Sequence, residues 1–131
     1  MIPDRIIEQG TLQSSGPRVS VEVRIPWYRS LPASCIAGAD LSIDGHAVPE
    51  DSLRWEMNGR TFTFDEMAEV TDEWWFPVDS AVLSGAADIA DGTEHSVAVD
   101  LSLYIPYIII GDGEVLRIHE HDEKTMKVVS A

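Results

Sequence analysis

The sequence predicts an all-β fold, either an antiparallel β-sandwich or an open barrel, with one short helix. Apolar and polar residues alternate with period two over residues 18–25 and 94–105. Such alternation places one set of side chains on a single face of a sheet. Turn-forming pairs such as Asp44-Gly45 and Asn58-Gly59 separate shorter apolar runs. Several short strands with frequent turns are typical of sandwiches and related open barrels.

The first expected strand spans residues 18–25, and a loop follows at residues 26–35 because two prolines interrupt that segment. The pair Asn58-Gly59 predicts a hairpin, since both residues tolerate the positive φ of a two-residue turn. One or two helical turns are expected over residues 63–69, with Asp65 as the capping residue. Further strands are expected at 39–43, 53–57, 60–64, 74–78, 81–83 and 94–105, with a loop at 85–92.

The chain has 131 residues, which suits a single domain. Within a domain of residues 1–131 we expect an N-terminal extension at 1–17 and a C-terminal tail at 111–131, the tail forming an edge strand or a hairpin arm. Cys35 is the only cysteine, which excludes an internal disulfide and fits a reducing compartment. No signal segment and no run of about 18 apolar residues is visible, so we expect a cytoplasmic protein.

The chain is strongly acidic. Nine Lys and Arg residues stand against 23 Asp and Glu residues, a formal net charge of −14. This charge repels nucleic-acid phosphates and anionic membrane surfaces, so the sequence argues against both as partners. The charge is explained by solubility alone, or by a partner that carries a positive patch.

Each of the two alternating runs is followed by a proline and then by aromatic residues. Proline has no N–H to donate, so Pro26 and Pro106 are expected to end the two strands. The adjacent Trp74 and Trp75 point to opposite faces of a strand, so one is expected in the core and the other at the surface. Aromatic and arginine side chains often anchor protein interfaces. The candidate residues for an interface or for shaping a substrate cleft are Trp27, Tyr28, Arg29, Trp75 and Tyr107.

A metal site is a second possibility. His119 and His121 would point the same way from a strand, and a third ligand would have to come from His95 or His46. The alternative is an exposed polar tail. No nucleophile motif or glycine-rich phosphate loop is visible, so no catalytic residue is assigned.

Seven short motifs occur in an order that resembles one known family. They are Arg24-Ile-Pro-Trp-Tyr-Arg-Ser-Leu-Pro32, Leu41-Ser-Ile-Asp-Gly45, Met57-Asn-Gly59, Thr61-Phe-Thr-Phe64, Asp72-Glu-Trp-Trp-Phe76, Gly92-Thr-Glu-His95 and Tyr104-Ile-Pro-Tyr107. Together they resemble the small β subunit of bacterial C-glycoside deglycosidases, over about residues 18–110.

The resemblance implies an accessory, non-catalytic subunit that is inactive alone. Its implied partner is an α subunit with a sugar-isomerase-like barrel and a divalent metal, expected to be manganese, whereas no cofactor is expected on this chain. The complex would cleave the carbon–carbon bond between a 3-oxo-sugar and an aromatic aglycone such as a flavonoid by β-elimination. The small subunit would dock on the barrel and help to close the substrate cleft.

Two other functions remain open from the residues themselves. One is a stand-alone carbohydrate- or glycoside-binding module that uses the same aromatic side chains. The other is a small metal-dependent enzyme built on His119 and His121. The tail from Gly111 lies outside the resemblance, so the family likeness does not support these two histidines.

Overall fold

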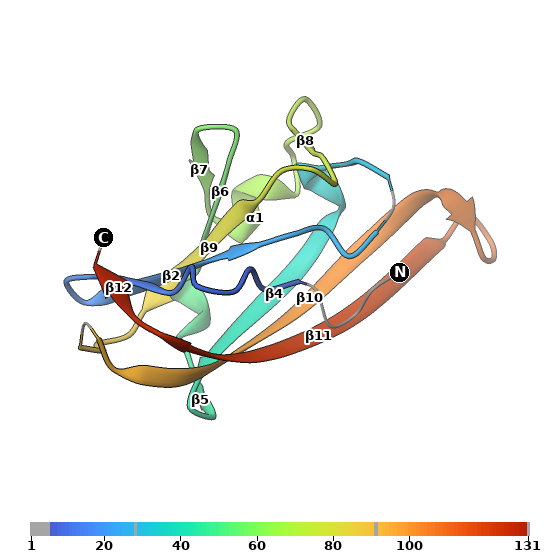
Figure 1. Cartoon of the computed structure of the whole chain (residues 1–131). Helices are drawn as coiled ribbons and strands as arrows, with labels where there is room; N and C mark the ends of the chain where they lie inside the picture. The colour runs from blue at the N-terminus through green and yellow to red at the C-terminus, as the bar shows by residue number, and fades with distance from the viewer. Residues whose placement is uncertain (1–5, 28, 91, 131) are drawn as a thin grey trace.

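Two β-sheets packed against each other form the protein, as the computed structural model shows (Figure 1). The structure describes residues 6–27, 29–90 and 92–130. One sheet has the strand order β12-β1-β2-β9-β6-β7, the other has the order β11-β10-β4-β5, and β3 and β8 form a small ladder of their own. The predicted all-β class is confirmed, in its sandwich form.

The strands are β1 (Gln13–Ser15), β2 (Arg18–Val23), β3 (Leu31–Pro32), β4 (Ile36–Ile43), β5 (His46–Ala47), β6 (Arg54–Met57), β7 (Arg60–Phe62), β8 (Trp74–Trp75), β9 (Ala81–Ala86), β10 (Glu94–Ile109), β11 (Val115–Lys127) and β12 (Val129–Ser130). The helix α1 is Phe64–Met67, and two short 3-10 helices are η1 (Ala33–Cys35) and η2 (Glu50–Ser52). Within the described residues, no helix has the length and apolar character needed to cross a membrane.

The hydrophobic core lies between the two sheets. The alternating side chains of β2 and β10 face it, as the sequence predicts, and those of β10 from Val97 to Ile105 are all 0% exposed. Trp55 and Trp75 add two large buried rings, whose centroids lie 5.0 Å apart at an interplanar angle of 80°. Edge-to-face packing of this kind is favourable for aromatic pairs.

The predicted end of β2 is two residues too late, and the predicted end of β10 at Pro106 is wrong. Strand β2 ends at Val23, before Pro26, and β10 continues through Pro106 to Ile109. At Pro106 the ladder with β11 shifts register, passing from the pair Ile105–Leu116 to the pair Ile109–Val115. The irregularity removes the need for an N–H donor at the proline, so the strand resumes beyond it.

Several local predictions need correction. The expected loop at 26–35 contains β3 and η1, and the strand expected at 74–78 is only two residues long. The helix cap is Thr63 instead of Asp65, because the Thr63 hydroxyl accepts from the Glu66 N–H while the Glu66 carboxylate accepts from the Thr63 N–H. This reciprocal capping box satisfies two amide donors at the helix start.

The hairpin at Asn58-Gly59 is confirmed. Its two turn residues have φ values of 56° and 80°, and β6 pairs with β7 on either side. Positive φ at both turn residues is characteristic of the type I′ hairpin turn.

The C-terminal segment forms a hairpin arm, since β11 pairs with β10 along almost its whole length.

The N-terminal residues belong to the core. Ile6, Ile7 and Leu12 are at most 3% exposed. The buried carboxylate of Asp122 on β11 accepts hydrogen bonds from the Ile7 N–H at 2.8 Å and from the Lys124 ammonium at 2.6 Å. This contact ties the N-terminal segment to the four-stranded sheet.

Replacing Asp122 with alanine is expected to lower the free energy of unfolding by about 3 kcal/mol. The substitution leaves the buried Ile7 N–H without its acceptor and removes the carboxylate that Lys124 contacts. Urea denaturation followed by circular dichroism measures the change. The neighbouring exposed variant Glu123→Ala serves as control and should stay within about 0.5 kcal/mol of wild type. Equal midpoints for both variants would contradict the role of Asp122.

Candidate docking surface

Three segments rich in apolar side chains emerge at the same end of the sandwich. The end of β2 pairs with the start of β9 through Val23 and Ala81. The far part of β10 pairs with the start of β4 through Leu103 and Ile36. We call residues 24–27, 29–32, 74–80 and 104–114 the docking end. In Figure 1 the β8 loop projects at the top of the molecule, and the tip of the β10–β11 hairpin projects at its right.

Two of the predicted candidate segments meet in a side-chain cluster. The Trp27 indole N–H donates a hydrogen bond to the Tyr107 hydroxyl. The Arg29 guanidinium lies 5.2 Å from the centroid of the Tyr107 ring, a distance suited to a cation–π contact. The half-buried Trp27 also packs against the core. The cluster therefore fixes the start of the hairpin tip to the loop that follows β2. The candidate Tyr28 lies outside the described residues.

Exposed apolar side chains are concentrated at the docking end. Of the eight large apolar side chains exposed in the described part of the chain, seven belong to it: Trp74, Phe76, Val78, Tyr104, Tyr107, Ile109 and Ile110. The eighth is Val129. Residues 104–110 contain no charged residue, although the chain carries 32 in all. Exposed apolar surface gathered in this way marks an interaction site.

The choice of Trp75 as an interface residue is wrong. Its side chain is 0% exposed, and its indole N–H donates to the Asp79 carbonyl at 3.1 Å. Trp74, on the opposite face of the same short strand, is 44% exposed. The two tryptophans point to opposite faces, as the alternation rule predicts. Trp75 is the buried one, because it pairs with the buried Leu31 of β3.

The histidines of β11 do not assemble a metal site with His95 or His46. The Asp100 carboxylate lies 2.8 Å from His121 Nδ1 and 3.3 Å from His119 Nε2, and the Ser102 hydroxyl lies 2.9 Å from His119 Nδ1. His95 instead contacts Asp44 at 2.6 Å, at the start of β10. Among the described residues, no group of three or more His, Cys, Asp or Glu side chains is arranged to hold a metal ion.

Cys35 is placed as a core residue. Burial raises the pKa of its thiol, while a hydrogen bond with Ser34 acts in the opposite direction. The thiolate is the reactive form of cysteine, so a raised pKa disfavours a nucleophilic role.

Comparison with known proteins assigns the chain to a family. A family model described as "C-glycoside deglycosidase beta subunit" matches residues 7–107. The chain belongs to this family. A C-glycoside deglycosidase beta subunit from Microbacterium trichothecenolyticum is 67% identical over the full length of both chains. One from Arthrobacter globiformis is 64% identical over 98% of each chain. A 3′-dehydrocarminate deglycosidase beta subunit from a Microbacterium species is 34% identical, over 98% of this chain and 96% of its own.

Sequence reasoning named Trp27, Arg29 and Tyr107 as candidates without predicting that they contact one another, and it did not name Ile109 and Ile110. The signal was present, since the apolar run from Tyr107 to Ile110 is bounded by Gly111. A run of this kind also fits a buried strand, and sequence alone could not show that β10 extends past the point where the opposite sheet covers it.

The β8 loop is held by a polar contact that depends on pH. The Glu73 carboxylate accepts hydrogen bonds from Asn58 at 3.0 Å and Arg60 at 2.9 Å, and these two contacts lower its pKa below the ordinary value of 4.5. A lowered pKa in the folded state stabilises the fold fully above the ordinary value, and this stabilisation is lost as the pH falls through the folded-state pKa.

The variant Glu73→Gln is therefore expected to lose less stability than wild type on acidification from about pH 6 to about pH 3. Urea midpoints measured across this range give the two curves. Parallel curves would show that the Glu73 contacts contribute nothing to the acid sensitivity.

Proposed function

We propose that this chain is the accessory subunit of a hetero-oligomeric C-glycoside deglycosidase and binds its larger partner through the docking end. The concentration of seven exposed apolar side chains at one end carries the proposal. The relatives reported above, all named as beta subunits, support it. An apolar core surrounded by polar surface is the usual anatomy of a stable subunit interface.

The reaction we propose for the complex is cleavage of the carbon–carbon bond between a 3-oxo-sugar and an aromatic aglycone, such as a flavonoid. The 3-keto group acidifies the neighbouring C2–H, so a base can remove that proton. The electron pair then forms the C1–C2 double bond, and the aglycone leaves from C1 and takes up a proton from an acid. We assign the base, the acid and a divalent metal, manganese, to a sugar-isomerase-like barrel in the partner.

The share of this chain in that reaction is to bind the partner, to hold the cleft in shape and to exclude water. Its Trp27–Arg29–Tyr107 cluster keeps the hairpin tip in one position, which lowers the entropy lost when the interface forms. We assign the complex to the cytoplasm, since Cys35, the single cysteine of this chain, is free.

A stand-alone glycoside-binding module is the second candidate, because Trp74 and Phe76 each leave 44% of their surface exposed. Exposed rings can stack on the faces of sugars or flavonoids. In that case the isolated chain would bind a C-glycoside without any partner.

Activity is expected only when the purified chain is mixed with its partner subunit. Release of the aglycone from a 3-oxo-C-glycoside, followed by liquid chromatography, measures it. The isolated chain should show no turnover and no quenching of its tryptophan fluorescence on titration with the glycoside. Turnover by the chain alone would refute the accessory role, and saturable quenching would favour the binding module.

Placing a charge in the apolar tip should weaken the complex. Ile109→Asp is expected to raise the dissociation constant for the partner by at least about tenfold, because a carboxylate would be buried without a counter-ion. Surface plasmon resonance measures the constant. Val129→Asp is the matched control, an exposed apolar residue away from the docking end, and should bind as wild type. Equal weakening by both variants would exclude the docking end as the contact.

A further inference from the structure

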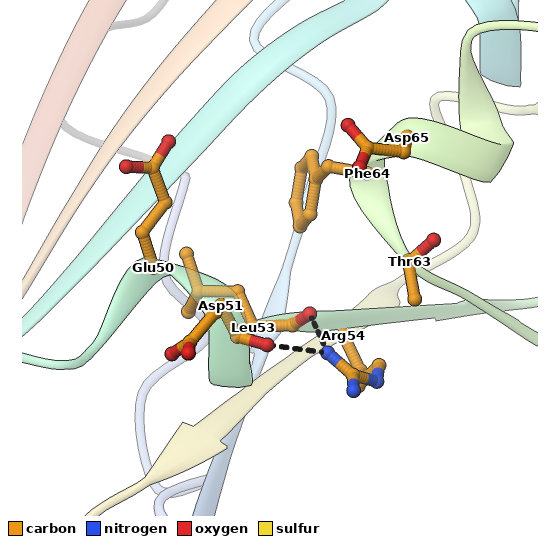
Figure 2. Close-up of a pocket in the computed structure, with 7 residues that line it drawn as sticks. All are labelled: Glu50, Asp51, Leu53, Arg54, Thr63, Phe64 and Asp65. Carbon is orange, nitrogen blue, oxygen red and sulfur yellow. Dashed lines mark hydrogen bonds between the residues drawn. The ribbon is translucent and has the colours of Figure 1, made fainter.

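A continuous groove runs beside β4, from α1 and η2 toward β10 and β11. It consists of three adjoining hollows of about 620, 340 and 280 Å³ that share lining residues. Figure 2 shows the first hollow, where the Phe64 ring faces the space between Glu50 and Asp65. The second hollow adds the small residues 37–39 of β4, and the third reaches His119. The start of β4 lies at the docking end, so groove and docking end are close together.

The floor of the groove includes an open strand edge. Strand β5 pairs only with Ser42 and Ile43 of β4. Within the described part of the chain, no strand pairs with this side of β4 between Ile36 and Asp40. The Leu41 carbonyl accepts from the Val48 N–H at 2.9 Å, so the main-chain groups of Leu41 point away from β10. Because these groups alternate along a strand, the N–H and C=O of Ala39 also point outward, into the groove.

The groove is acidic. Five carboxylates line it: Asp40, Glu50, Asp51, Asp65 and Asp100. The Arg54 guanidinium donates to the main-chain carbonyls of the preceding residues Asp51 and Leu53, at 3.0 and 2.8 Å (Figure 2). Arg117 lies over the Tyr104 ring at 5.8 Å. The surplus of negative charge therefore favours a positively charged occupant.

The groove also has an apolar wall, formed by Leu53, Phe64 and Ala68. Lysine and arginine side chains bury their aliphatic stems on such walls while the charged groups reach carboxylates. A bound strand meets both needs, since its main chain pairs with the open edge and its alternate side chains enter the hollows.

We propose that an extended, basic segment of the partner subunit binds in this groove as an added strand on β4. The segment pairs with the outward main-chain groups of Ala39 and places its cationic side chains among the five carboxylates. This proposal rests on the proposed function, because it takes the occupant from the same partner that contacts the docking end.

The variant Gly38→Val tests the groove directly. A Cβ at Gly38 meets no atom within 4 Å, and the residue does not have positive φ, so the substitution is compatible with the free chain. Valine favours strand conformation, and its side chain, which stands perpendicular to the sheet, occupies part of the hollow that the side chains of the segment would enter. We expect the dissociation constant for the partner subunit to rise about tenfold, because these side-chain contacts are lost. Surface plasmon resonance with the intact partner subunit measures it.

Ser42→Val is the matched control. Ser42 lies on the same strand and the same face as Gly38, but beside β5 and away from the residues that line the groove. This variant should bind the partner within about twofold of wild type. Thermal unfolding of both variants shows whether each is folded as wild type.

Amide hydrogen exchange supplies a readout that needs no substitution. The outward Ala39 N–H should exchange at least about tenfold more slowly in the complex than in the free chain. If the complex forms but Gly38→Val binds as wild type and Ala39 exchange is unchanged, the groove proposal is overturned while the accessory role stands. If the wild-type chain does not bind the partner at all, the proposed function fails, and this inference fails with it.

Discussion

The structure depends on the burial of one face of β10. Five alternate side chains, from Val97 to Ile105, are completely removed from water. Each such burial contributes about 1.5–3 kcal/mol, so this strand alone supplies on the order of 10 kcal/mol toward the cost of ordering the chain. The same strand pairs with β4 on one side and β11 on the other. Register is therefore fixed for the whole four-stranded sheet, because a slip by one residue would turn the core face toward solvent.

The fixed register gives each face of that sheet a different role. The inner face forms the core, whereas the outer face carries Asp100, Ser102 and His119, which bond mainly with one another. Beyond the bulge at Pro106 the strand leaves the core, and its side chains become surface. Exposed apolar surface thus begins where the opposing sheet stops covering β10. The acidic groove follows β4, the neighbour of β10, from that same end of the molecule.

Sequence patterns predicted the elements whose signals are local. The alternation of β2 and β10 and the Asn58-Gly59 turn each follow from a few adjacent residues. The wrong assignments depended on tertiary contacts. Pro106 does not end β10 because a bulge accommodates it, and Trp75 rather than Trp74 is buried because of the strand it pairs with. The short strands β1 and β12 carry no alternation of their own, and β12 is defined by its pairing with β1, far away in the chain.

The pairing of β1 with β12 has a consequence for how the protein folds. Strand β12 lies parallel to β1, with Val129 beside Gln13. The β12 edge of the six-stranded sheet therefore forms only after two segments more than a hundred residues apart in the sequence have met. Long-range closure of this kind slows folding.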